Sequence, residues 1–100
     1  MVLYIDTKDR NLIKVSLKKG NGVVKSLSEE NQLGSQVLLP LIMKLLQTTN
    51  CKLQTLTGIE VEKGPGSFVG LRVGVSVANA LGFSLGIPVN GKKIETELEY

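Results

Sequence analysis

A small residue at every fourth position in residues 67–86 is the feature that most constrains this chain. These small residues are Gly70, Gly74, Ala78, Gly82 and Gly86. The spacing is meaningful on an α-helix, where residues four apart lie on the same side. Valines at alternate positions of the same segment would also fit a strand, but a strand with so many glycines would be weak, and the segment is long for one. We therefore predict a helix.

Packing must compensate for these glycines, because each one inside a helix costs up to about 1 kcal/mol relative to alanine. A stripe of small residues lets another element approach the helix backbone closely. Two occupants of the stripe remain open at this point. It can receive the sheet or the first helix of its own domain, or it can receive a helix from another protein.

Periodicity elsewhere predicts an α/β domain with the element order β-β-β-α-β-α-β. The five expected strands lie at residues 2–6, 12–18, 23–28, around Ile59 and Val61, and at 87–89. The first three form an antiparallel meander, because alternating apolar residues flank a Gly-Asn-Gly turn. Apolar residues at helical spacing predict the first helix over residues 35–48. Within it, Pro40 either kinks the helix or marks its true beginning.

The loop Gly64-Pro65-Gly66-Ser67 joins the fourth strand to the helix that carries the stripe. Backbone N–H groups at a helix N-terminus can bind phosphate, and Arg72 one turn later could hold an anion or face solvent. The loop lacks the Lys-Ser/Thr pair of a Walker motif. Two interpretations stay open: a phosphate-binding loop, or a tight turn in which Ser67 caps the helix.

Asp6 and Thr7 end the first strand and are the other candidate site. A carboxylate and a hydroxyl at a strand end can organise a phosphate or a metal ion, and Asp6 could pair with Asp9 or Glu60 to do so. The alternative is that Asp6 only forms a turn.

Composition excludes several chemistries. The 100 residues include no histidine and one cysteine, Cys51, so the sequence holds no Ser-His-Asp triad, no Cys-His pair and no histidine-ligated metal. The length suits one domain, which we assign to residues 1–94, followed by an acidic tail at 95–100. The net charge is +3, without a clustered basic run. We expect a cytoplasmic protein with no membrane segment.

Three motifs resemble the N-terminal domain of the bacterial TsaB (YeaZ) family. They are Tyr4-Ile5-Asp6-Thr7, the segment from Gly34 to Ile42, and above all the segment from Gly64 to Gly74, which Gly86-Ile87-Pro88-Val89 follows. The resemblance covers nearly the whole chain. It implies an actin-like, ribonuclease-H-like domain with a mixed five-stranded sheet and two main helices.

The resemblance implies a non-catalytic subunit that binds TsaD, the enzyme that transfers threonylcarbamoyl to the adenosine next to the anticodon of tRNA. A TsaE-type ATPase completes the complex, and contact with tRNA is expected only through that complex. In the family the two helices form a bundle with TsaD or with a second TsaB, so we expect a homodimer in isolation. The implied interface residues are Leu38, Leu41, Ile42, Leu45, Gly70, Gly74, Val77 and Ala78. No cofactor, metal or catalytic residue is implied.

The alternative hypothesis is half of an actin-like nucleotide-binding enzyme, either a kinase or a TsaD-type protein. Its phosphate loop would consist of Asp6, Thr7, Gly64, Gly66, Ser67 and Arg72. TsaD-type proteins bind metal through histidines, which this sequence lacks, so we expect no enzyme activity. The chain also departs from the family pattern, which commonly has histidine where Gly34 stands and an acidic residue where Gln36 stands.

Overall fold

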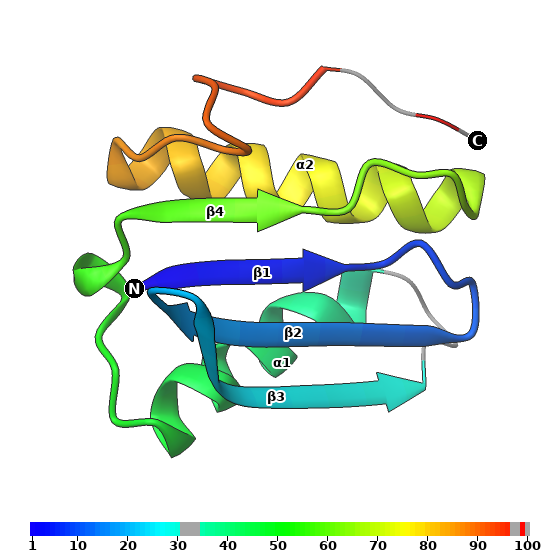
Figure 1. Cartoon of the computed structure of the whole chain (residues 1–100). Coiled ribbons are helices and arrows are strands. Elements are labelled where there is room, and N and C mark those ends of the chain that lie inside the picture. The colour runs from blue at the N-terminus through cyan, green and yellow to red at the C-terminus, as the bar shows by residue number, and fades with distance from the viewer. Residues whose placement is uncertain (31–34, 97–98, 100) are drawn as a thin grey trace.

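The alternating residues of β2 (Leu12–Lys19) determine which face of the sheet is buried. Ile13, Val15 and Leu17 have no exposed surface, whereas Leu12 and Lys14 are exposed. The computed structural model describes residues 1–30, 35–96 and 99. It places both main helices on the face that Ile13, Val15 and Leu17 occupy, with the hydrophobic core between helices and sheet (Figure 1).

The described part of the chain forms a four-stranded sheet in the order β3-β2-β1-β4. Its other strands are β1 (Val2–Asp6), β3 (Gly22–Glu30) and β4 (Gly58–Val61). β1 is antiparallel to β2 and parallel to β4, so Leu3 lies opposite both Leu17 and Ile59. The turn between β2 and β3 has Gly20 at φ 62°, which glycine adopts without steric cost. The predicted meander is confirmed.

Helix α1 (Ser35–Thr48) packs on β2 and β3, and α2 (Phe68–Leu85) packs on β4 and β1. A short 3-10 turn, η1 (Leu53–Thr55), lies between α1 and β4. Of the two possibilities for Pro40, the structure contradicts a helix that begins there, because α1 already begins at Ser35 and includes Pro40. Pro40 is exposed and lies near the start of the helix, so its missing N–H removes one early hydrogen bond.

The fifth strand predicted at residues 87–89 is wrong, because of these three residues only Val89 forms bridges, one parallel to Ile59 and one antiparallel to Lys92. Pro88 has no N–H to donate to a ladder. Immediately afterwards, Asn90 at φ 53° and Gly91 at φ 75° turn the backbone away. The extended segment therefore ends after one residue pair, and the order of the regular elements stops at α2.

The first residue of the predicted acidic tail is Glu95, and it is buried. Glu95 is only 1% exposed, and the amide of Glu99 donates to the carbonyl of Lys63 at 2.7 Å. The segment from Gly86 to Glu95 returns over the molecule beside β4 and α2 (Figure 1). Glu95 therefore belongs to the packed domain.

Helix α2 is long and apolar enough to cross a membrane by length and composition, with a mean hydropathy of 1.5 over its 18 residues. Our sequence analysis did not expect such a segment. The buried face of this helix, from Gly70 to Gly82, packs on the sheet. The core helix of a globular domain has this same character, since it is apolar on the side that it buries.

Candidate partner-binding surface

The small-residue stripe packs against the end of β1. Thr7 is fully buried, and its hydroxyl donates a hydrogen bond to the carbonyl oxygen of Gly70 at 2.6 Å. A methyl group on Gly74 would overlap the Thr7 hydroxyl oxygen, and one on Gly82 would lie 2.6 Å from Val89 Cγ2. Of the two occupants left open for the stripe, the structure shows the chain's own strand.

The predicted interface residues lie mainly in the interior. Those of α1, Leu38, Leu41, Ile42 and Leu45, are at most 4% exposed and belong to the core cluster. On α2, Gly70, Gly74 and Ala78 are buried, and Val77 alone of this set is partly exposed. Apart from Val77, these residues therefore pack the helices on the sheet in the domain's own core, and their role in an interface stays a prediction. Gly34 lies outside the described residues.

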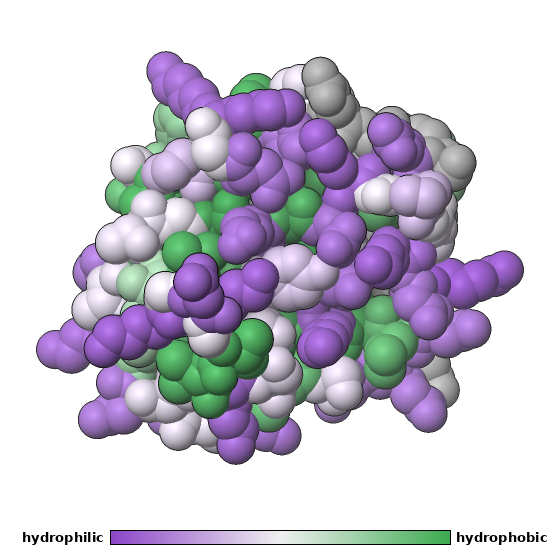
Figure 2. All heavy atoms as spheres, in the orientation of Figure 1, coloured by the Kyte–Doolittle hydropathy of each residue, from purple (hydrophilic) through white to green (hydrophobic). Residues whose placement is uncertain are grey.

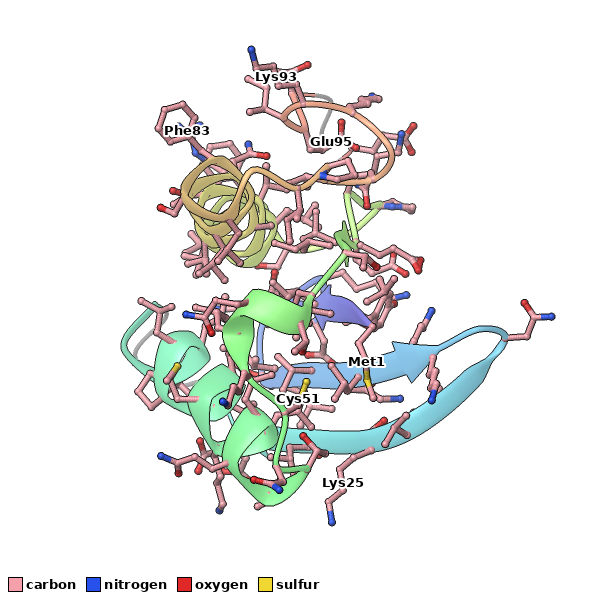
Figure 3. All side chains as sticks on the ribbon, turned by 90° about the vertical axis from the view of Figure 1, so that its left-hand side faces the viewer. Met1, Lys25, Cys51, Phe83, Lys93 and Glu95 are labelled. Carbon is pink, nitrogen blue, oxygen red and sulfur yellow. The ribbon has the colours of Figure 1, made fainter. Side chains whose placement is uncertain are left out.

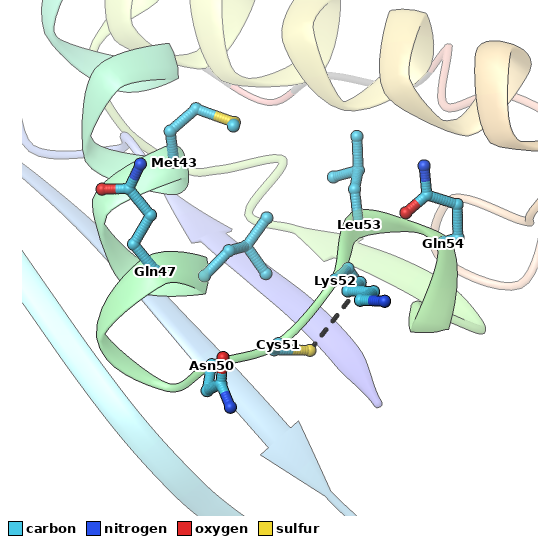
Figure 4. A pocket seen from close by; sticks show the side chains of 8 residues that line it. Met43, Gln47, Asn50, Cys51, Lys52, Leu53 and Gln54 are labelled. Carbon is cyan, nitrogen blue, oxygen red and sulfur yellow. Dashed lines mark hydrogen bonds between the residues drawn. The ribbon is translucent and has the colours of Figure 1, made fainter.

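Other apolar side chains of the same two helices do face outward. Leu39 and Met43 of α1 are 46% and 48% exposed. Figure 4 shows Met43 extending toward the side of α1 on which α2 lies. On α2, Val69 is 64% exposed, and Val73 and Val77 are partly buried against the core cluster. We call these five residues the helix surface.

A shallow hollow of about 370 Å³ adjoins this surface and is lined by Arg72, Val73, Ser76 and Val77. Arg72 is exposed, and its guanidinium lies 5.1 Å from the centre of the Phe68 ring. The hollow therefore combines apolar walls with a cation at its rim. An apolar side chain with an acidic neighbour on an approaching helix would match both features.

The candidate phosphate loop and the end of β1 do lie together, as the alternative hypothesis required. The amide of Ser67 donates to the carbonyl of Lys8 at 2.8 Å, and a methyl group on Gly66 would lie 2.6 Å from that same oxygen. This contact leaves no room for a side chain at Gly66. It brings two of the sequence motifs into one cluster.

The polar groups of this cluster bind one another. Ser67 Oγ accepts from the amide of Gly70 at 3.3 Å and caps α2, and the Thr7 hydroxyl is occupied by Gly70. Asp6 accepts from the amide of Lys8 at 3.1 Å, which is the arrangement of a turn. Arg72 is directed to Phe68 instead. The capping and turn interpretations are the ones that this geometry favours.

The two carboxylates suggested as partners of Asp6 each have another partner. Asp9 accepts from the amide of Asn11 at 2.8 Å, and Glu60 forms an ion pair with Lys18 at 3.6 Å. Within the described residues no group of three or more Cys, Asp and Glu side chains is arranged to hold a metal ion.

The face of the sheet opposite the helices carries a polar network that the sequence analysis missed. Hydrophilic side chains dominate this face (Figure 2). The Tyr4 hydroxyl donates to Glu62 at 2.6 Å, and Lys18 Nζ lies 4.5 Å from the centre of the Tyr4 ring. Burial, and next the hydrogen bond to Glu62, raise the pKa of Tyr4 well above its usual range. The alternation of polar residues in the strands is the sequence signal for such a face.

A second missed network surrounds Glu95, which Figure 3 shows beneath the loop that follows α2. Its carboxylate accepts from Asn90 Nδ2 at 2.8 Å and from Lys92 Nζ at 3.0 Å. Its backbone amide donates to Asn79 Oδ1 at 2.7 Å, and its carbonyl accepts from Asn79 Nδ2 at 2.8 Å. Asn90 also pairs with both backbone groups of Val61. The side-chain amide of Asn90 thus forms hydrogen bonds to the backbone of β4, next to which the fifth strand was expected.

Cys51 lines an open pocket of about 320 Å³ between the end of α1 and η1, together with Met43, Gln47 and Leu53 (Figure 4). Its thiol lies 3.0 Å from the hydroxyl of Thr55 and 3.7 Å from the carbonyl of Lys52. Cys51 is partly buried, as a small apolar residue after a helix commonly is.

Comparison with known proteins shows which family the chain is similar to. The family model described as TsaD, tRNA N6-adenosine threonylcarbamoyltransferase, matches residues 6–91. The tRNA threonylcarbamoyladenosine biosynthesis protein TsaB of Buchnera aphidicola is 37% identical over 91% of this chain and 43% of its own length. The Bacillus subtilis TsaB is 33% identical over 89% of this chain and 39% of its own length.

Among solved structures, YeaZ from Pseudomonas aeruginosa superimposes with a TM-score of 0.80 at 31% identity. The superposition covers 88% of this chain and 41% of YeaZ. The chain therefore spans less than half the length of these relatives. The similarity supports the expected fold class, although the described sheet has four strands.

Proposed function

The chain belongs to the TsaD family, and on this premise we propose that it is a binding subunit in tRNA threonylcarbamoyladenosine biosynthesis. Its partner is a TsaD-type protein, and the contact is the helix surface of α1 and α2. The observation that carries this proposal is the exposure of Leu39, Met43 and Val69 on two adjacent helices whose core faces are already occupied. Apolar side chains gathered in this way mark protein interaction sites.

The rest of the complex follows from the same resemblance. In the absence of the TsaD-type protein, a second copy of the chain occupies the helix surface and forms a homodimer. A TsaE-type ATPase joins the complex, which contacts tRNA as a whole and acts in the cytoplasm. These partners are part of the proposal, supported by the TsaB relatives and by the two outward-facing helices.

The chain itself performs no chemistry in this proposal. The Thr7 hydroxyl and Ser67 Oγ form hydrogen bonds within the fold, so a phosphate would have to displace them. The competing function, half of a nucleotide-binding enzyme, is supported by the proximity of Ser67 to Lys8 at the end of β1. Calorimetric titration with MgATP distinguishes the two. We expect no heat of binding and no phosphate release, and hydrolysis by the chain alone would support the enzyme.

Binding to the partner is tested with the TsaD-type protein of the same organism by size-exclusion chromatography with light scattering. We expect co-elution with the unmodified chain. The variant Met43→Glu should elute separately, because it buries a charge without a partner in the contact. Leu12→Glu is the matched control, since Leu12 is 41% exposed on β2 and lies outside both helices. Loss of binding with both variants, or with neither, would contradict the assignment of the surface.

A further inference from the structure

Strand β3 is a long edge of the sheet. It has nine residues, and within the described part of the chain it pairs only with β2. Seven of its side chains besides that of Gly22 are exposed, and only Leu27 is partly buried. Figure 3 shows Lys25 extending from β3 away from the rest of the molecule. The backbone donors and acceptors on its outer side are therefore open to another strand.

Natural edge strands are usually guarded by charges that repel an added strand. The charges of β3 have the opposite effect toward a second copy of β3. Lys25, Leu27 and Glu29 lie on one face of the strand, because they alternate with Ser26 and Ser28. In an antiparallel pair of two β3 strands centred on Leu27, each Lys25 faces the Glu29 of the other copy.

The remaining positions of that register are also compatible. Leu27 faces Leu27 on the two-fold axis, and each Ser26 faces a Ser28. Opposite charges, apolar pairs and hydroxyl pairs directly across an antiparallel ladder are each stabilising. A two-fold axis through a residue pair is the symmetry that a closed dimer requires.

A β-bulge in β3 marks one end of the segment that can form this contact. Leu17 pairs with Lys25, but the next residue of β2, Lys18, pairs with Val23, so Val24 is an extra residue. A bulge bends its strand and disturbs the ladder locally. The straight part of β3 thus begins at Lys25, which is where the complementary segment from Lys25 to Glu29 starts.

We propose that β3 is a homotypic interface, through which two copies of this chain pair antiparallel with Lys25 of each opposite Glu29 of the other. The contact joins the two sheets into one continuous sheet. It uses none of the helix surface residues. A chain paired through β3 can therefore still hold a different partner on α1 and α2, so this inference does not depend on the proposed function.

Charge reversal tests the proposed register. Sedimentation equilibrium is run on the chain carrying Met43→Glu, which removes self-association through the helix surface. In this background we expect a concentration-dependent dimer. Lys25→Glu should weaken it at least tenfold by placing like charges opposite each other, and Glu29→Lys should do the same. The combination of both substitutions should restore the affinity. Lys44→Glu, at an exposed position of α1, is the control and should change nothing.

The pairing also has a direct readout. Hydrogen exchange of the amides from Lys25 to Glu29 should slow as the chain concentration rises, while exchange in α1 should not change. A monomer at all concentrations would overturn the proposal, and so would a dimer whose affinity the two reversals do not change. A double variant no stronger than the single ones would overturn the register.

Discussion

The hydroxyl of Thr7 donates a 2.6 Å hydrogen bond to the carbonyl oxygen of Gly70. This bond ties the end of β1 to the first turn of α2, and Gly74 lies against the same side chain one turn later. The first part of the stripe, Gly70 and Gly74, therefore packs closely on one buried threonine. On the outward side of α2, Val69 is 64% exposed.

Substitution of Gly74 by alanine should destabilise the fold. The new methyl group overlaps the Thr7 hydroxyl, and overpacking of this kind costs about 1–3 kcal/mol. Alanine regains up to about 1 kcal/mol of helix propensity, so the expected net loss is at most about 2 kcal/mol when the full gain is realised. Urea unfolding followed by circular dichroism measures the change.

Thr7→Ala tests whether overlap with the Thr7 hydroxyl causes the loss of stability in Gly74→Ala. It removes the hydroxyl that the methyl group would meet, so the double variant should lose less stability than the sum of the two single variants. Strictly additive losses would show that the two side chains do not compete for space.

Removal of the Glu95 carboxylate should be costly. Glu95→Ala removes a buried carboxylate that accepts one of the two Asn90 Nδ2 hydrogen bonds, and an unmade hydrogen bond of this kind costs about 1–3 kcal/mol. Glu60→Ala is the matched control, because its ion pair with Lys18 is half exposed and pairs of this kind contribute about 0–1 kcal/mol. Equal urea midpoints for the two variants would contradict the role of Glu95 in the fold.

Tyr4 should make stability fall at alkaline pH. Its pKa is raised in the folded chain by burial and by the hydrogen bond to Glu62, so the folded state keeps the proton more strongly than the unfolded state does. Stability from this group is fully present below about pH 10, the usual pKa of tyrosine, and is lost as the pH rises further. Unfolding at pH 9 and pH 11 should show a smaller decrease for Tyr4→Phe than for the unmodified chain. An equal decrease would mean that Tyr4 does not contribute.

The sequence predicted the regular elements well, because their periods are local. The strand at 2–6 and the helix at 35–48 have the predicted boundaries. The apolar residues of the helix that fall at helical spacing are buried: Leu38, Leu41, Ile42, Leu45 and Leu46. The prediction of a fifth strand was wrong, because Pro88 and the positive φ of Asn90 interrupt the ladder. A short apolar run does not reveal such an interruption.

The site was harder to predict than the fold, because its contacts join residues far apart in the chain. The spacing of the stripe is the same whether a partner helix or Thr7 occupies it, and 63 positions separate Thr7 from Gly70. Likewise, nothing near Glu95 in the sequence indicates the hydrogen bonds to Asn79, 16 positions away. The outward residues Leu39 and Met43 could be identified only after the core faces of the helices were known.

We propose that the outer side of α1 and α2 binds a TsaD-type protein. Isothermal titration calorimetry of the chain into that protein, with and without Val73→Glu, tests it most directly, with Leu12→Glu as the control. We expect saturable binding that Val73→Glu weakens at least tenfold and Leu12→Glu leaves unchanged. Binding of equal strength by all three chains, or no binding by the unmodified chain, would contradict it.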